Sequence, residues 1–84
     1  MEWCEGQPNV VVFNVHQSGW TGKGFPDLIL CVNGQAVYVE LKVGKNQMEP
    51  AQRIWRKRIL RAGGKHIAPY SFEEFLKEIE KWLQ

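Results

Sequence analysis

The sequence predicts an α/β fold in which a small mixed β-sheet of about four strands is flanked by helices, in the order β-β-β-α-β-α. Two observations predict it. The first half of the chain carries short runs of β-branched and aromatic residues separated by glycine-containing turns. The second half carries two segments whose apolar residues recur at helical spacing. With 84 residues, 44% of them hydrophobic, residues 1–84 form a single small domain.

Three strands are expected before the first long helix. Val10–Val15 is the first, and the glycine-rich stretch 18–26 that follows must be a loop. Asp27–Val32 and Ala36–Lys42 form a hairpin around Asn33-Gly34, because a type I′ turn needs a positive φ at both central positions. Residues 1–8 are expected to be irregular, since glycine and proline would interrupt a helix there.

Two helices and a fourth strand follow. Pro50 opens the first helix and Gly63-Gly64 ends it. Its inward face is predicted to be Ala51, Ile54, Trp55, Ile59 and Ala62. Lys65–Ala68 is a short strand, and Ser71 with Glu74 forms a capping box for the last helix. That helix has an apolar stripe that we interpret as core, made of Phe72, Phe75, Leu76, Ile79, Trp82 and Leu83.

The charge is unevenly distributed along the chain. Residues 21–66 hold nine Lys or Arg against three acids, whereas residues 1–20 and 67–84 each sum to −2. A basic middle indicates a polyanionic partner, although a solvated helix face is the simpler alternative. No leader and no bilayer-spanning apolar run is evident, so we expect a soluble, cytoplasmic protein. Four Trp and four Phe are many for one small core, which favours self-association.

The cysteines and histidines point to no site by themselves. Cys4 and Cys31 lack metal-ligand spacing and are expected to be reduced. His16 and His66 lie far apart in the sequence, and each is interpreted as structural.

The hairpin register brings three chemically active residues together. With Asn33-Gly34 as the turn, Asp27 lies opposite Glu40, so that their side chains share one side of the sheet. Lys42, two residues beyond Glu40, projects from the same side. Two adjacent carboxylates repel each other, and a divalent cation such as Mg²⁺ or Mn²⁺ would remove that repulsion and polarise a phosphoryl oxygen. The alternative is a surface salt bridge between Lys42 and Glu40.

The literal motif is more specific than this geometry. Gly24-Phe25-Pro26-Asp27 is followed by Glu40-Leu41-Lys42, in which Glu40 comes thirteen positions after Asp27, and then by Glu49-Pro50-Ala51-Gln52. This order resembles the PD-(D/E)XK nuclease signature and, within it, the virus-type replication-repair nuclease (VRR-NUC) domain found in bacteriophage proteins and in the Fanconi-associated nuclease. The resemblance covers the chain from about Val10 to its last helix, and it implies a restriction-endonuclease-like core.

The resemblance also implies roles for individual residues. Asp27, Glu40 and the backbone carbonyl of Leu41 would bind Mg²⁺ or Mn²⁺, Lys42 would be the catalytic lysine, and Gln52 would lie near the active site. The family usually begins with a longer helix that bears a further acidic ligand. Here only Glu2 and Glu5 precede the first strand, so whether either replaces that ligand stays open.

The residues expected to contact a DNA substrate are basic. Candidate phosphate contacts are Lys23, Lys45, Arg53, Arg56, Lys57 and Arg61. No sequence-reading module is recognisable, which favours structure-selective over site-specific cutting. The resemblance implies a homodimer acting on branched DNA, such as a Holliday junction during repair, in the host cytoplasm if the protein is phage-encoded. A DNA-binding module without catalysis, or a structural subunit of a larger nuclease, remains the alternative.

Overall fold

The computed structural model describes residues 2–16, 22–44 and 47–83 and has a mixed α/β fold. The elements are α1 (Glu2–Glu5), β1 (Val10–Asn14), β2 (Leu28–Val32), β3 (Gln35–Val39), α2 (Pro50–Arg61), β4 (Lys65–Ile67) and α3 (Phe72–Leu83). The sheet order is β1-β2-β3-β4; the first three strands are antiparallel and β4 runs parallel to β3. A mixed four-stranded sheet flanked by helices is therefore confirmed.

The prediction that residues 1–8 are irregular was wrong in one respect, because Glu2–Glu5 forms a single helical turn. The amide of Gly6 closes it by donating to the carbonyls of Glu2 and Trp3 at 3.3 and 3.2 Å. A helix of this length has no intrinsic stability. Packing supplies it, since Cys4 is buried in the core and the Trp3 ring meets the Phe75 ring edge-on at 5.8 Å between centroids.

The predicted hairpin register is confirmed along the whole of β2 and β3. Leu28 pairs with Val39, Leu30 with Val37 and Val32 with Gln35. The turn residues Asn33 and Gly34 have φ values of 49° and 81°, as a type I′ turn requires. The Asn33 side chain also donates to the carbonyl of Trp82 at 2.8 Å, which ties the turn to the end of α3.

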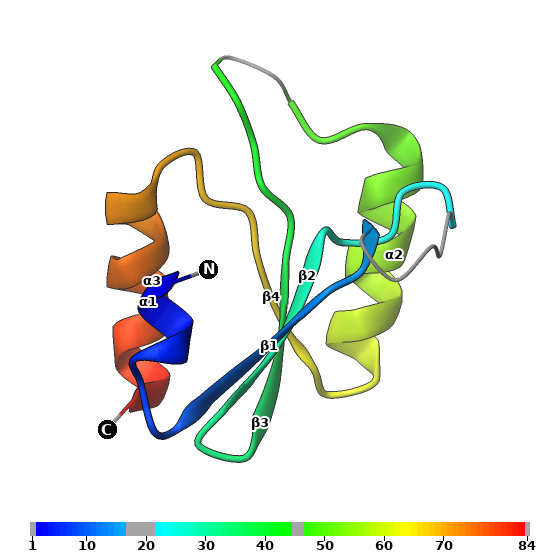
Figure 1. The fold of residues 1–84 in the computed structure, drawn as a ribbon. Coiled ribbons are helices and arrows are strands. Elements are labelled where there is room, and N and C mark those ends of the chain that lie inside the picture. The colour runs from blue at the N-terminus through cyan, green and yellow to red at the C-terminus, as the bar shows by residue number, and fades with distance from the viewer. Residues whose placement is uncertain (1, 17–21, 45–46, 84) are drawn as a thin grey trace.

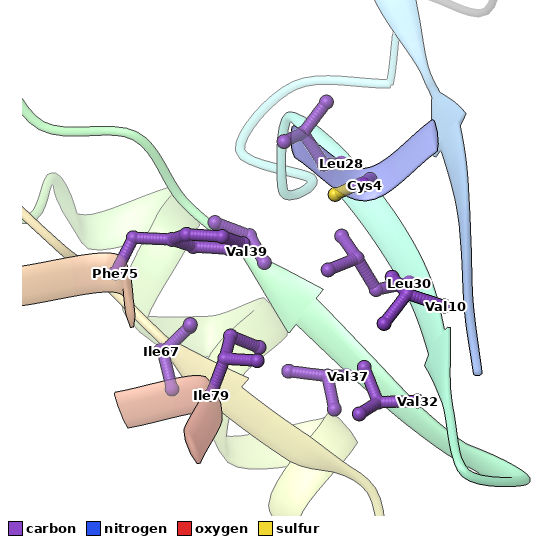
Figure 2. Packing of buried hydrophobic residues seen from close by; sticks show 10 residues of the cluster. All are labelled: Cys4, Val10, Leu28, Leu30, Val32, Val37, Val39, Ile67, Phe75 and Ile79. Atoms are coloured by element: carbon purple, nitrogen blue, oxygen red, sulfur yellow. The ribbon is translucent and has the colours of Figure 1, made fainter. Parts of the chain in front are cut away.

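The helices cover the two faces of the sheet unequally. Figure 1 shows α1 and α3 together on one face and α2 on the other. The main core lies under α3, where Phe75 and Ile79 point toward Val37, Val39 and Ile67 (Figure 2). The apolar stripe of α3 is thus confirmed as core contact, although Phe72 at its start is half exposed.

The α2 face is only partly covered. Ile59 is buried, but Ile54, which was predicted to face inward, is 59% exposed, and Ala62 is exposed too. The helix packs mainly on β4. The β1 half of this face therefore stays open, with Val11 68% and Phe13 52% exposed and Cys31 beside them. In the described part of the chain, no helix has the length and apolar character needed to cross a membrane.

Gly24 docks the loop that precedes β2 onto the start of α2. Its φ is +79°, and a Cβ atom there would lie 2.6 Å from both the carbonyl carbon and the Cβ of Ala51. We therefore expect Gly24→Ala to combine backbone strain with a steric clash and to destabilise the fold by about 2–4 kcal/mol in urea unfolding. Gly34→Ala is the matched control, because its φ is also positive but no atom lies within 4 Å of the added Cβ. Equal losses in the two variants would contradict the close approach.

Candidate active site

The candidate site forms where the β2–β3 ladder ends. The amide of Asp27 donates to the carbonyl of Val39 at 2.9 Å. Beyond this point the chain hydrogen-bonds to a different neighbour. The amide of Glu40 donates to the carbonyl of Ile67 at 2.9 Å, and the amide of Lys42 donates to the carbonyl of Pro69 at 3.1 Å. The strand predicted to reach Lys42 therefore ends at Val39, because residues 40–42 pair with the chain that continues β4 instead of with β2.

Asp27 is held by hydrogen bonds on both carboxylate oxygens. His16 Nε2 lies 2.6 Å from Oδ1, and the amide of Leu41 donates to Oδ2 at 2.8 Å. Partial burial alone would raise the pKa of Asp27, but hydrogen bonds from Glu40, Leu41 and His16 outweigh it and lower the pKa below its usual value. Asp27 is therefore an oriented anion at neutral pH.

Glu40 has the opposite character. Only 2% of its surface is exposed, and its Oε1 atom is buried without a hydrogen-bond partner. Burial, together with a hydrogen bond to Asp27 and the charge of Asp27, raises the pKa of Glu40 to about 8. Without a cation the pair thus shares a proton: a neutral Glu40 carboxyl donates to the Asp27 carboxylate.

Lys42 lies against the start of α2. Its Nζ donates to the carbonyl of Gln47 at 3.2 Å and to Oε1 of Gln52 at 3.1 Å. The same Gln52 oxygen accepts the amide of Glu49 at 2.8 Å, one half of a helix capping box. The surface salt bridge considered as the alternative is not formed, since Lys42 makes no ion pair with Glu40. The charge of Lys42 nevertheless lowers the pKa of Glu40, whereas the charge of Glu49 raises it.

The donor set fits a divalent cation only in part. Asp27 and Glu40 supply two hard oxygen ligands, and the unpartnered Oε1 of Glu40 is a buried acceptor that a cation would satisfy. Among residues 2–16, 22–44 and 47–83, no set of three or more His, Cys, Asp or Glu side chains is arranged around one ion. Glu2 and Glu5 are exposed on α1, beside α3 on the opposite face of the sheet (Figure 1). Neither replaces the missing acid in this arrangement.

The basic residues fall on two flanks of α2. Arg53, Arg56 and Lys57 line a hollow of about 430 Å³ together with Met48 and Ala68. Arg61 and Lys23 are exposed elsewhere, and Lys45 lies outside the described residues. Arg58, which was not among the candidates, is on the other flank, where its guanidinium carbon lies 4.6 Å from the centre of the Trp55 ring.

Comparisons with protein-family models, with curated proteins and with solved structures found no match for this chain. The fold stands as a mixed α/β domain. The resemblance to a nuclease family therefore stays an expectation from the sequence motif.

Sequence reasoning missed His16. It was interpreted as structural, yet its ring contacts Asp27 directly. The register of β1 on β2 would have revealed it, since the amide of Val15 donates to the carbonyl of Asp27 at 3.1 Å and His16 comes next. The sequence could not fix that register, because the long loop after His16 carries no hairpin signature. His66 lies in β4, where burial and the charge of Arg56 lower its pKa to about 4, so its ring is neutral at pH 7.

Proposed function

We propose that this chain is a metal-dependent DNA endonuclease that hydrolyses phosphodiester bonds at Asp27, Glu40 and Lys42. The observation that carries the proposal is the pair of carboxylates at the end of the hairpin, one an oriented anion and the other buried with an unpartnered oxygen. Leaving a buried carboxyl oxygen without a hydrogen-bond partner is costly, and a site that keeps one is a candidate for function.

A divalent cation fits this pair in the proposal. Asp27 and Glu40 would hold Mg²⁺ or Mn²⁺, with the adjacent Leu41 carbonyl as a further oxygen ligand. The cation would supply Lewis-acid activation of the phosphodiester. His16 and the Leu41 amide orient Asp27, while Gln52 orients the Lys42 ammonium toward the charge that builds on the phosphate during hydrolysis.

The basic flank supports a nucleic-acid substrate. The hollow lined by Arg53, Arg56 and Lys57 lies on the helix that also carries Gln52, so phosphate contacts there would place a backbone near the acids. The open β1 half of the sheet, with Val11 and Phe13 exposed, supports the proposed homodimer, which would present two sites to two strands of branched DNA.

The test is a cleavage assay over single-stranded, flapped, four-way and fully paired DNA, with Mg²⁺, Mn²⁺ or EDTA. We expect cutting only with a divalent cation and preference for branched substrates. Cleavage in EDTA would contradict the metal-dependent mechanism, and equal cutting of every substrate would contradict structure selectivity.

A second candidate function is a DNA-binding module without catalysis. It is favoured by the absence of a third acidic or histidine ligand among the described residues. Binding of branched DNA without nicking at millimolar Mn²⁺ would select it over the nuclease.

His16 provides a further prediction. We expect His16→Ala to weaken Mn²⁺ binding, measured by calorimetry, about 10- to 100-fold, because Asp27 loses the bond that orients it. The His16 side chain is exposed, so thermal stability should change little. His16→Gln should restore part of the affinity, since its amide N–H can also donate to Asp27. Unchanged Mn²⁺ affinity in both variants would exclude a positioning role for His16.

A further inference from the structure

A second hollow, of about 490 Å³, lies on the α2 face of the sheet. We call it the aromatic pocket, and its walls include Phe25, Ala36, Tyr38, Trp55, Arg58 and Gly64. The Phe25 ring is 5.0 Å from that of Trp55 and 6.1 Å from that of Tyr38, between centroids, and is nearly perpendicular to both. Three different segments thus bring aromatic surface to one place: the loop before β2, the strand β3 and the helix α2.

The Trp55 ring is held in position by two contacts. Trp55 Nε1 donates to the carbonyl of Lys23 at 3.1 Å, which satisfies the polar edge of the indole and sets its orientation. Arg58 places its charge over the same ring, 4.6 Å from the centre. Phe25, Tyr38 and Trp55 all remain only partly buried, so the pocket presents aromatic surface and a cation to solvent.

The pocket lies next to the proposed site along the chain, at the start of β2 and the end of β3. Phe25 comes two residues before Asp27, and Tyr38 comes two residues before Glu40. Beyond the end of β3 the amides of Glu40 and Lys42 still donate to the chain that carries β4, so the backbone stays extended there. Side chains two residues apart on an extended chain share a face, so Tyr38 and Glu40 project from the α2 side, about 6–7 Å apart along the chain. That spacing is of the order of one nucleotide in an extended strand.

We propose that the aromatic pocket binds an unpaired nucleobase adjacent to the phosphodiester that is cut. Aromatic faces with an arginine beside them bind bases by stacking, and the hollow is large enough to admit a planar heterocycle. A base within a duplex is already stacked and cannot enter, so the pocket selects branched or bulged DNA over paired DNA. The inference rests on the proposed function and names the feature of the substrate that the site selects.

Binding measurements test the pocket without requiring cleavage. The ligands are a DNA duplex with a one-nucleotide bulge, the same duplex with an abasic residue in the bulge, and the fully paired duplex, all in EDTA. We expect the wild-type protein to bind the base-containing bulge about 5- to 100-fold more tightly than the abasic one, which is what stacking of one base supplies. Equal affinity for the two bulges overturns the proposal.

Two variants assign the preference to the pocket. Arg58→Ala removes an exposed side chain, and Ala36→Phe fills the pocket from an exposed position. Both should lose the discrimination between the two bulges. Lys77→Ala removes one positive charge from an exposed position of α3, on the other face of the sheet. This variant should keep the discrimination between the two bulges. If Arg58→Ala weakens all three DNAs equally, the arginine acts only on phosphates and the proposal fails.

Failure of this inference is distinguishable from failure of the proposed function. If the protein cuts DNA with a divalent cation but does not discriminate between the two bulges, the proposed nuclease function holds and the base-binding role of the pocket is rejected. If the protein discriminates between the two bulges but does not cut DNA, the base-binding role of the pocket holds and the non-catalytic DNA-binding module is favoured. Sedimentation at the same concentrations tests one further possibility. If the wild-type protein is a dimer that Ala36→Phe dissociates, and neither protein discriminates between the bulges, the pocket binds a second copy of the chain instead of a base.

Discussion

Replacing Lys42 by alanine is expected to lower the rate of metal-dependent DNA cleavage by about 10²- to 10³-fold, the usual loss when one fixed charge-stabilising group is removed from an active site. Lys42 Nζ is positioned by the Gln47 carbonyl and by Gln52 Oε1 and forms no ion pair with Glu40. Its positive charge is therefore not neutralised by a carboxylate, and under the proposed function it would face the substrate phosphate.

Binding and cleavage should separate in this variant. We expect Lys42→Ala to bind branched DNA within a few-fold of wild type, because the basic flank of α2 is untouched. Lys42→Arg should not restore the rate, since a guanidinium does not reproduce the compact ammonium held by Gln52. Lys77→Ala on α3 controls for loss of one positive charge. Cleavage by Lys42→Ala at the wild-type rate would remove Lys42 from the mechanism.

Replacing Glu40 by glutamine is expected to stabilise the metal-free protein at alkaline pH while abolishing its stabilisation by Mn²⁺. In the folded chain the pKa of Glu40 is raised from 4.5 to about 8. Between those values the folded state holds a proton that the unfolded state has already released, so wild-type stability falls as the pH rises through this window. The slope is at most about 1.4 kcal/mol per pH unit. Glutamine cannot titrate, so this slope disappears.

Urea unfolding at about pH 5 and about pH 8, in EDTA and in Mn²⁺, measures both effects. Asp27 does not interfere, because its pKa is lowered below 3.8 and its contribution is lost only in more acidic solution. Glu80→Gln, an exposed change on α3, is the matched control and should behave as wild type. Parallel pH profiles for wild type and Glu40→Gln would show that Glu40 is not a buried, protonated acid in the metal-free protein.

The sequence predicted those parts of the fold that local signals determine. Asn33-Gly34 set the hairpin register, and that register alone placed Asp27 beside Glu40. Pro50 and Ser71 marked the helix starts that the structure has.

Features that depend on long-range packing were missed. The turn α1 exists because Cys4 is buried in the core and Trp3 packs on α3, which no local propensity indicates. Ile54 was predicted to face the core because apolar residues at helical spacing define an inward stripe. That spacing does not show how much of the sheet the helix covers, and Ile54 lies beyond the covered part. His16 and the aromatic pocket depend on the β1–β2 register and on the docking of the loop at Gly24 against Ala51.

The most direct test of the account is a calorimetric titration of the wild-type protein with Mn²⁺ near pH 7, repeated in two buffers of different ionisation enthalpy. If the cation displaces the proton shared by Asp27 and Glu40, binding should release about one proton per site and tighten as the pH rises toward 8. No binding at millimolar Mn²⁺, or binding without proton release, would contradict the claim that this carboxylate pair is a metal site.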